Sequence, residues 1–340
     1  MRRLTISLLA AATALAGLTV PATALAGPVS PCGSAGTAPA IRHVILVMLE
    51  NRSYKQVIGS SSAPFQTSLA ANCGVATAMF GATHTSAANY LALSAGEYPA
   101  SSPPGCGSIG KCADSGQSVY TQLDAAGLTW KAYEEAMPAA CDSASSGNYK
   151  IGHNPVIFYT SISSTECQSD DVPVADLTAQ AGAFWTDLQA GTLPSFSWVT
   201  PDLANDGENT CGGSCALSAA DTWLKNFTAI VQASPEYQAG NTLLLVTYDE
   251  GTGADAVTGE DCTNEALDMP VSQGTSAHQD SCHVPFLVVY PYTPSGDGDG
   301  TFLDHYSVTR TVEDVFGLSY LAHAGDQQTA SLVGHFGIAG

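Results

Sequence analysis

The segment Val44-Ile45-Leu46-Val47-Met48-Leu49-Glu50-Asn51 is an uninterrupted apolar run that ends at two polar residues. Similar short apolar runs recur at 196–199, 243–248 and 284–290. Runs of this kind predict strands that are covered on both faces, as in a mostly parallel sheet. Segments with helical character lie between or after them, at 87–94, 119–126, 219–233 and 307–318. The alternation predicts an α/β sandwich in which helices flank a mostly parallel central sheet.

Acidic residues directly follow three of these predicted strands. They are Glu50 with Asn51, then Asp202, Asp206 and Glu208, and then Asp249 with Glu250. The carboxyl ends of parallel strands meet at one edge of a sheet, so we expect these side chains at one rim. Converging carboxylates repel one another unless a cation lies among them, and such oxygen ligands suit a divalent metal. The alternative is that they are ordinary loop residues of an acidic protein.

The charge of the chain excludes several partners. Its 340 residues include Asp+Glu 31 and Lys+Arg 10, for a formal net charge of −21. Without a basic cluster such a chain does not neutralise a phosphate backbone, which excludes nucleic acid. Anionic membrane surfaces repel it for the same reason. The hydrophobic fraction of 45% is sufficient for a folded core, and we expect a monomeric globule.

Residues 1–26 have the pattern of a secretory signal peptide. Arg2 and Arg3 precede an apolar stretch over 4–20, and Ala24-Leu25-Ala26 offers small residues for cleavage. A membrane anchor is the alternative, but the stretch is short and interrupted by polar residues. We therefore expect a secreted protein with one catalytic domain over 27–340 and no stable membrane insertion. Loss of the two arginines changes the charge from −21 to −23.

All 10 cysteines follow the predicted signal peptide. An even number in a secreted protein indicates disulfides, although the sequence does not determine their connectivity. Because most of the cysteines lie in loops rich in Gly, Ser, Asp and Pro, we expect the disulfides to staple these loops. Proximity along the chain suggests Cys106–Cys112, Cys141–Cys167, Cys211–Cys215 and Cys262–Cys282, which leaves Cys32–Cys73.

Two further segments carry candidate reactive groups. Ser86 precedes a helix-like stretch that ends at Gly96, so its Oγ would lie by a helix N-terminus, where N–H groups favour an anion. Ser86 is equally suited to be the N-cap of that helix. His305 precedes an amphipathic stretch, and its place at a helix start favours a site role over a core role.

The sequence blocks together resemble a known family. Residues 43–54, which contain Glu50-Asn51-Arg52-Ser53-Tyr54, resemble the "ENRSF" signature of the bacterial phosphoesterase family. That family holds acid phosphatases and phospholipases C and is related in fold to alkaline phosphatase. Other blocks similar to family segments are 83–96, 130–138, 153–155, 249–251 and 304–314. They occur in family order and span about residues 43–318.

The resemblance implies a metal site and a catalytic group. Glu50, Asn51, Asp249 and Glu250 would bind one divalent ion, with Ca, Mg, Mn and Zn all suitable. Ser86 would be the nucleophile, ionised by that metal, and would form a phosphoenzyme. Asn89 would donate to a phosphate oxygen, and His305 would bind the phosphate or protonate the leaving alcohol.

The resemblance also implies substrate contacts. These would come from His84, His153, Asp206 and Glu208. Where relatives with two metals have a second ligand set, this chain offers Asp202, Asp206, Glu208 and His283.

The chain departs from the family pattern at three positions. Thr85 and Ala88 replace two prolines, which leaves Thr85 as a rival nucleophile, and Glu208 stands where many members have His. The resemblance implies a secreted, metal-dependent phosphoester hydrolase, an acid phosphatase that acts on small phosphomonoesters. The alternatives are a phospholipase C or phosphodiesterase that acts on zwitterionic phospholipid head groups, and a non-catalytic secreted binding protein on the same scaffold.

Overall fold

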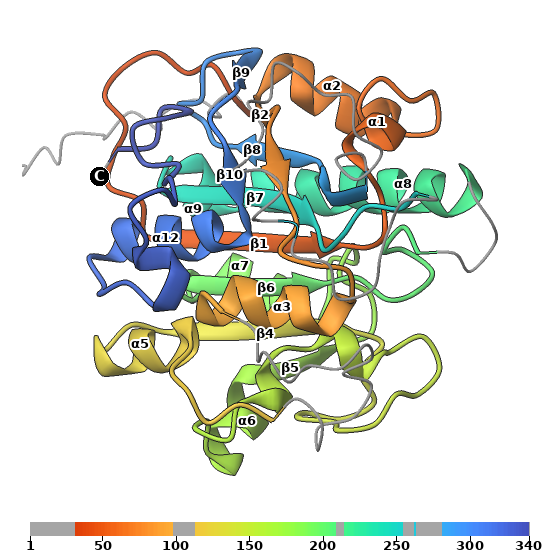
Figure 1. Ribbon diagram of the computed structural model, residues 1–340, viewed down its shortest axis with the longest axis vertical. Coiled ribbons are helices and arrows are strands. Elements are labelled where there is room, and N and C mark those ends of the chain that lie inside the picture. The colour runs from red at the N-terminus through yellow and green to blue at the C-terminus, as the bar shows by residue number, and fades with distance from the viewer. Residues whose placement is uncertain (1–30, 98–112, 209–213, 254–261, 263–280, 340) are drawn as a thin grey trace, which may run out of the picture.

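A computed structural model describes residues 31–97, 113–208, 214–253, 262 and 281–339 (Figure 1). The predicted signal peptide 1–26 lies outside these residues. The strands are β1 (His43–Leu49), β2 (Gly74–Ala76), β3 (Met79–Phe80), β4 (Trp130–Glu135), β5 (Asp171–Val174), β6 (Phe196–Thr200), β7 (Thr242–Tyr248), β8 (Phe286–Val289), β9 (Asp297–Asp299) and β10 (Leu303–Asp304).

The α-helices are α1 (Tyr54–Val57), α2 (Pro64–Asn72), α3 (Ser86–Ala95), α5 (Val119–Ala125), α6 (Ser164–Asp170), α7 (Gly182–Ala190), α8 (Ser214–Gln232), α9 (Pro235–Gln238) and α12 (His305–Phe316). Short 3₁₀ turns are η1 (Ile151–His153), η2 (Val156–Phe158) and η4 (Ala322–Gly325). The helices α3, α5, α8 and α12 begin and end within about five residues of the predicted ranges 87–94, 119–126, 219–233 and 307–318, whereas α1, α2, α6, α7 and α9 were not predicted.

The central sheet has eight strands in the order β5-β4-β6-β1-β7-β8-β2-β9. The strand β1 lies in its middle and pairs in parallel with β6 and β7. Its side chains from Val44 to Leu49 are fully buried, since neighbouring strands and two helical layers enclose them. The prediction of a mostly parallel sheet with helices on both faces is confirmed. The strand β8 is an exception, because it runs antiparallel to β7 and β2.

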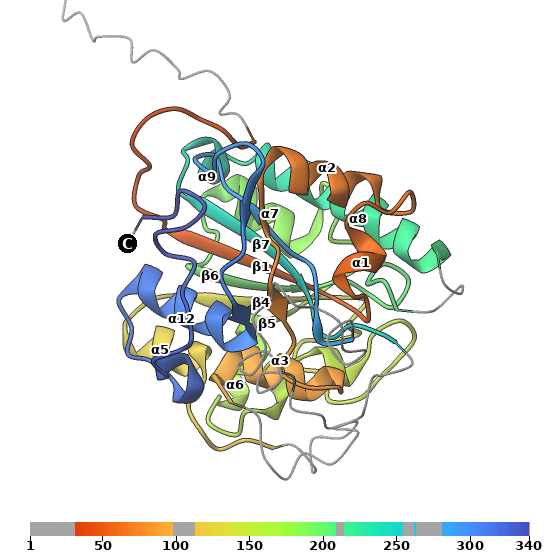
Figure 2. The same ribbon diagram turned by 45° about the horizontal axis from the view of Figure 1, so that its top comes forward.

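The sheet lies between two helical layers, as Figure 2 shows. One layer contains α3, α5 and α12, which contact one another, and the other contains α7, α8 and α9, with α2 packed against α8. The strands β1, β6 and β7 point the same way, so their carboxyl ends share one edge. The residues that follow these strands therefore meet at that edge. Among the described residues, no helix is both long and apolar enough to cross a membrane.

Three of the predicted disulfides are present in the structure. They join Cys32 to Cys73, Cys141 to Cys167, and Cys262 to Cys282, which confirms these pairings. The predicted Cys106–Cys112 pair and Cys211, the predicted partner of Cys215, lie outside the described residues. The Cys141–Cys167 bond closes the long connection between β4 and β5, so the expected loop staples are confirmed.

A buried pair of acids, Glu134 and Asp171, lies between β4 and β5. Glu134 is 1% exposed and Asp171 is 0% exposed. The Asn154 amide donates to both Asp171 carboxylate oxygens, at 3.0 and 2.9 Å. Burial raises the pKa of Asp171 to about 7, although the Asn154 bonds lower it. Burial and the Asp171 charge also raise the pKa of Glu134 well above its ordinary value.

This pair predicts that the stability of the protein depends on pH. A raised carboxyl pKa stabilises the folded state below the unfolded pKa, and this contribution is lost as the pH rises toward about 7. We expect Asp171→Asn to raise the free energy of unfolding by roughly 1–3 kcal/mol at pH 8 and by much less at pH 5. Denaturant unfolding at both pH values measures this, with Asp170→Asn as the matched control. Equal effects at the two pH values would contradict the prediction.

Candidate active site

The carboxyl ends of β1 and β7 bring the first predicted ligands together. Asn51 has φ of +56°, a left-handed conformation that Asn tolerates better than most residues. The resulting turn lets the Asn51 N–H donate to Asp249 Oδ1 at 2.9 Å, and its side-chain amide donates to Glu50 Oε2 at 2.9 Å. Glu250 follows Asp249 directly. The predicted rim of acidic side chains is therefore present.

The candidate nucleophile lies beside this rim. Thr85 is the N-cap of α3 and Ser86 is the first residue of the helix, so the alternative that Ser86 is the N-cap is wrong. The Ser86 hydroxyl instead donates to Glu50 Oε2 at 3.1 Å. Ser86 and Thr85 are both partly exposed, whereas Glu50 is fully buried. This geometry places an accessible hydroxyl against a buried carboxylate at a helix N-terminus.

Tyr90 and His153 complete the surroundings of Glu50. The Tyr90 hydroxyl donates to Glu50 Oε1 at 2.8 Å, and His153 Nε2 lies 3.4 Å from the same oxygen. The two rings stack with centroids 5.6 Å apart. Our sequence reasoning missed Tyr90, although it lies four residues after Ser86, a spacing that puts both on one helix face. Burial, followed by the Lys150 charge, lowers the pKa of His153 well below its ordinary value.

The buried acids at the rim destabilise one another when ionised. Burial raises the pKa of Glu50 well above its ordinary value, and Asp249 and Asp206 raise it further. Burial and the neighbouring Glu250 raise the pKa of Asp249 to about 7, although the Asn51 N–H lowers it. Burial also raises the pKa of Asp206 to about 8. Ionised acids at this density need a compensating positive charge.

The residues at the rim fit a divalent cation. Asp249 Oδ2 and Asp206 Oδ2 are both buried and have no hydrogen-bond partner among the described residues. Unpartnered buried oxygens of this kind are costly unless something neutralises them. Carboxylate and amide oxygens are suitable ligands for a hard or borderline divalent ion. The donor types and the orphaned oxygens suit a divalent ion at this rim, and the assignment of Glu50, Asn51, Asp249 and Glu250 as its ligands stays a prediction.

The loop that follows β6 provides Asp206 and Glu208. The Asp206 carbonyl accepts from the Glu50 N–H at 2.8 Å, and Asp206 Oδ2 lies 3.8 Å from His153 Nδ1. Gly207, with φ of +100°, allows this turn, since a side chain there would come within 3.0 Å of the Glu50 carbonyl oxygen. Glu208 pairs with Lys150, with 3.2 Å between Oε2 and Nζ. Lys150 is a second residue at this site that our sequence reasoning missed.

The side-chain groups of Asn89 and His305 bind the backbone. Asn89 Oδ1 accepts from the N–H groups of Ala82 and Thr83, and its amide donates to the Thr83 carbonyl at 2.7 Å. His305 Nε2 lies 3.2 Å from the Tyr248 carbonyl oxygen, and its Nδ1 accepts from Ala82 N–H at 3.3 Å. Burial lowers the pKa of His305 to about 4. These contacts fix the turn before Ser86, and the roles of both residues toward phosphate stay predictions.

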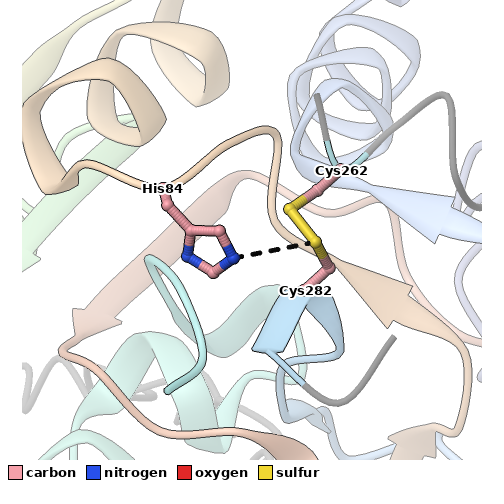
Figure 3. Close-up of side chains that lie close together, drawn as sticks. All are labelled: His84, Cys262 and Cys282. Atoms are coloured by element: carbon pink, nitrogen blue, oxygen red, sulfur yellow. Dashed lines mark hydrogen bonds between the residues drawn. A yellow bond between two sulfur atoms is a disulfide. The ribbon is translucent and has the colours of Figure 1, made fainter. Parts of the chain in front are cut away.

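His84 lies between the rim and a disulfide. Its Nδ1 is 3.1 Å from Glu250 Oε2, and its Nε2 is 3.2 Å from Ser281 Oγ. Figure 3 shows His84 Nε2 pointing at Cys282, whose sulfur is 3.8 Å away, within the Cys262–Cys282 disulfide. His84 is therefore placed to orient Glu250, and its predicted contact with substrate stays a prediction.

The disulfide also fixes the turn that leads to Ser86. The Cys282 carbonyl accepts from Gly81 N–H at 2.9 Å, and the Cys262 N–H donates to the Ala82 carbonyl at 3.1 Å. The turn between β3 and α3 is thus held at two backbone positions by the two bonded cysteines.

The structure uses Asp202 and His283, the other residues of the predicted second ligand set, in other ways. Asp202 Oδ2 accepts from the Asn148 amide at 3.0 Å. His283 stacks on Tyr54 with ring centroids 4.6 Å apart, and its Nε2 lies 3.1 Å from the Thr77 carbonyl oxygen. Asp206 is thus the buried member of this set at the rim.

Solved structures with a similar fold support this description. A protein of the alkaline phosphatase superfamily from Vibrio parahaemolyticus superposes with a TM-score of 0.57 at 15% identity, over 89% of this chain and 72% of that one. The chain therefore has an alkaline-phosphatase-like fold.

Sequence comparison identifies the family more closely. The model of the Phosphoesterase family matches residues 60–319, and the chain belongs to that family. It is 29% identical to a phosphatidylinositol-3-phosphatase of Mycobacterium tuberculosis, over 88% of this chain and 85% of that protein. It is 26% identical to a probable acid phosphatase of Kluyveromyces lactis, over 86% of this chain and 63% of that protein. The protein is a hydrolase that acts on phosphoester bonds.

Proposed function

We propose that this protein is a secreted, metal-dependent phosphomonoesterase of the acid phosphatase type that uses Ser86 as its nucleophile. The observation that carries the proposal is the hydrogen bond from the Ser86 hydroxyl to the buried Glu50 carboxylate, next to Asp249. Two of the relatives are named as phosphatases, one of them toward phosphatidylinositol 3-phosphate. We therefore take phosphomonoesters, including those on lipid head groups, as the substrate class.

The residues at the rim have separate tasks in this reaction. Glu50 accepts the hydrogen bond of Ser86, so the hydroxyl proton faces the carboxylate and an oxygen lone pair is available to attack. Tyr90 holds the other Glu50 oxygen, which fixes the orientation of the carboxylate. The N-terminus of α3 faces the incoming phosphate, where free N–H groups favour an anion.

Bond formation and bond breaking balance across two steps. The Ser86 oxygen bonds to phosphorus while the bond from phosphorus to the alcohol oxygen breaks, and the proton that Ser86 loses corresponds to the proton that the alcohol gains. Water then hydrolyses the phosphoserine, which releases inorganic phosphate and restores the hydroxyl.

Glu50, Asn51, Asp249 and Glu250 would hold one divalent ion in this site. When bound, it supplies positive charge that offsets the carboxylates, favours the ionised Ser86 hydroxyl and attracts phosphate. The buried oxygens without partners, Asp206 Oδ2 and Asp249 Oδ2, support this part of the proposal.

The three disulfides among the described residues support secretion, because such bonds persist in oxidising compartments.

Parallel assays of four substrates test the proposed function. We expect p-nitrophenyl phosphate and a water-soluble short-chain phosphatidylinositol 3-phosphate, which presents no anionic surface, to be hydrolysed with kcat/KM at least about tenfold above bis-p-nitrophenyl phosphate and phosphatidylcholine, a difference in barrier that corresponds to about 1.4 kcal/mol. Phosphate or p-nitrophenol release measures the rates. Faster cleavage of phosphatidylcholine than of either monoester would replace the proposal with a phospholipase C.

A further inference from the structure

Lys150 belongs to a segment that packs on α3, the helix that begins at Ser86, although the two residues are distant in sequence. It precedes η1, and the Lys150 carbonyl accepts from the His153 N–H at 2.9 Å. The same turn packs on the first turn of α3, since a methyl group placed on Gly152 would lie 3.9 Å from the Ala87 side chain. Ala87 directly follows Ser86. The chain from Lys150 to His153 therefore borders the site on the side of α3.

The Lys150 ammonium is accessible and weakly held. Its Nζ lies 3.2 Å from Glu208 Oε2 and 3.4 Å from Oε1, and the two side chains are 40% and 31% exposed. An ion pair this exposed contributes little to stability, so an incoming anion can replace Glu208 at small cost. Burial lowers the pKa of Lys150, but the charges of Glu208, then Glu50 and Asp206, outweigh this effect and leave the pKa raised.

We propose that Lys150 is a specificity-determining residue that favours the doubly charged phosphate of a monoester over the singly charged phosphate of a diester, with Glu208 as its competitor. The attraction of a fixed cation grows with the charge of the anion that it meets. The other charged side chains at the rim are mostly carboxylates. A lysine at its edge therefore attracts the doubly charged monoester more strongly than the singly charged diester. Glu208 competes for the same ammonium and repels phosphate directly. The inference rests on the proposed function, because it assumes that phosphate enters beside Ser86.

The test compares kcat/KM for p-nitrophenyl phosphate and bis-p-nitrophenyl phosphate. We expect Lys150→Met to lower kcat/KM about tenfold for the monoester, the scale of a lost hydrogen bond to a charged group. The diester should change by about threefold or less, as for an exposed ion pair. Lys150→Arg keeps the charge and should preserve the monoester preference. Lys225→Met, an exposed lysine of α8, is the matched control. An unchanged ratio of the two kcat/KM values in Lys150→Met overturns the proposal.

A double-mutant cycle isolates the role of Glu208. Glu208→Gln should raise the monoester kcat/KM several-fold in the native background and by less when Lys150 is Met. If Glu208→Gln raised the monoester kcat/KM equally in both backgrounds, the proposal that Glu208 competes with substrate for Lys150 would be wrong. In the wild-type protein, the ratio of kcat/KM for the monoester to kcat/KM for the diester tests the proposed function separately. A wild-type preference for the diester would refute the phosphomonoesterase, while the change of ratio in Lys150→Met still measures the contribution of Lys150.

Discussion

Replacing Ser86 by Ala should lower kcat for phosphomonoesters by about ten-thousand-fold or more, the scale seen when an enzyme loses its nucleophile. The reason is that the Ser86 oxygen is the only atom that Ser86→Ala removes, and this oxygen lies 3.1 Å from Glu50 Oε2. Initial rates with p-nitrophenyl phosphate measure the loss. Mass spectrometry of acid-quenched protein after incubation with substrate should find phosphate on Ser86 in the wild type.

Thr85→Ala is the matched control for this result. Thr85 is the adjacent hydroxyl and is also partly exposed, so it is the rival that the sequence leaves open. We expect Thr85→Ala to keep kcat within about tenfold of the wild-type value, because the change removes an N-cap residue and no reacting atom. If Ser86→Ala were fully active and Thr85→Ala inactive, the nucleophile would be Thr85.

Removing divalent metal should have the second-largest effect. We expect exhaustive chelation to reduce phosphate release to about 1% or less, since an uncompensated site loses several kcal/mol of transition-state stabilisation. Unfolding should also become easier, because Glu50 and Asp249 then lie buried side by side without a cation. Elemental analysis before and after chelation, together with Tm, checks both effects. Adding back one metal at a time identifies the ion that restores the rate.

Asp249→Asn provides an independent test of the same site. Asn keeps an oxygen that can accept from the Asn51 N–H but removes one carboxylate charge. We expect this variant to bind less than one equivalent of metal and to lose its activity, while its Tm no longer falls on chelation. Phosphate release that persists in protein shown to be metal-free would refute the metal-dependent mechanism.

The sequence predicts the centre of the fold better than its edges. The apolar runs at 44–49 and 243–248 correspond to β1 and β7, because strands buried on both faces leave no room for polar side chains. The strand β4 was not predicted, since it contains Lys131, Glu134 and Glu135. Tertiary contacts satisfy these groups: Lys131 Nζ lies 2.6 Å from Asp187 Oδ2, and Glu135 accepts from two backbone N–H groups. No local pattern reveals such distant partners.

The candidate site was also predictable only in part. The convergence of Glu50 and Asp249 follows from strand direction alone, and the structure confirms it. The contacts of Asn89 and His305 depend on a turn whose path is set by tertiary packing, so their backbone partners were beyond prediction. Lys150 was missed because it reaches the rim through an irregular connection, where residue spacing carries no directional information.

The Cys262–Cys282 disulfide ties the turn before Ser86 to the segment that precedes β8. In a reducing compartment this bond is not made, and the two cysteines whose backbone groups hold the turn before Ser86 lose their covalent link. Newly made chains would then be poor catalysts until they are oxidised. We expect protein refolded under a dithiol reductant to be less active than oxidised protein.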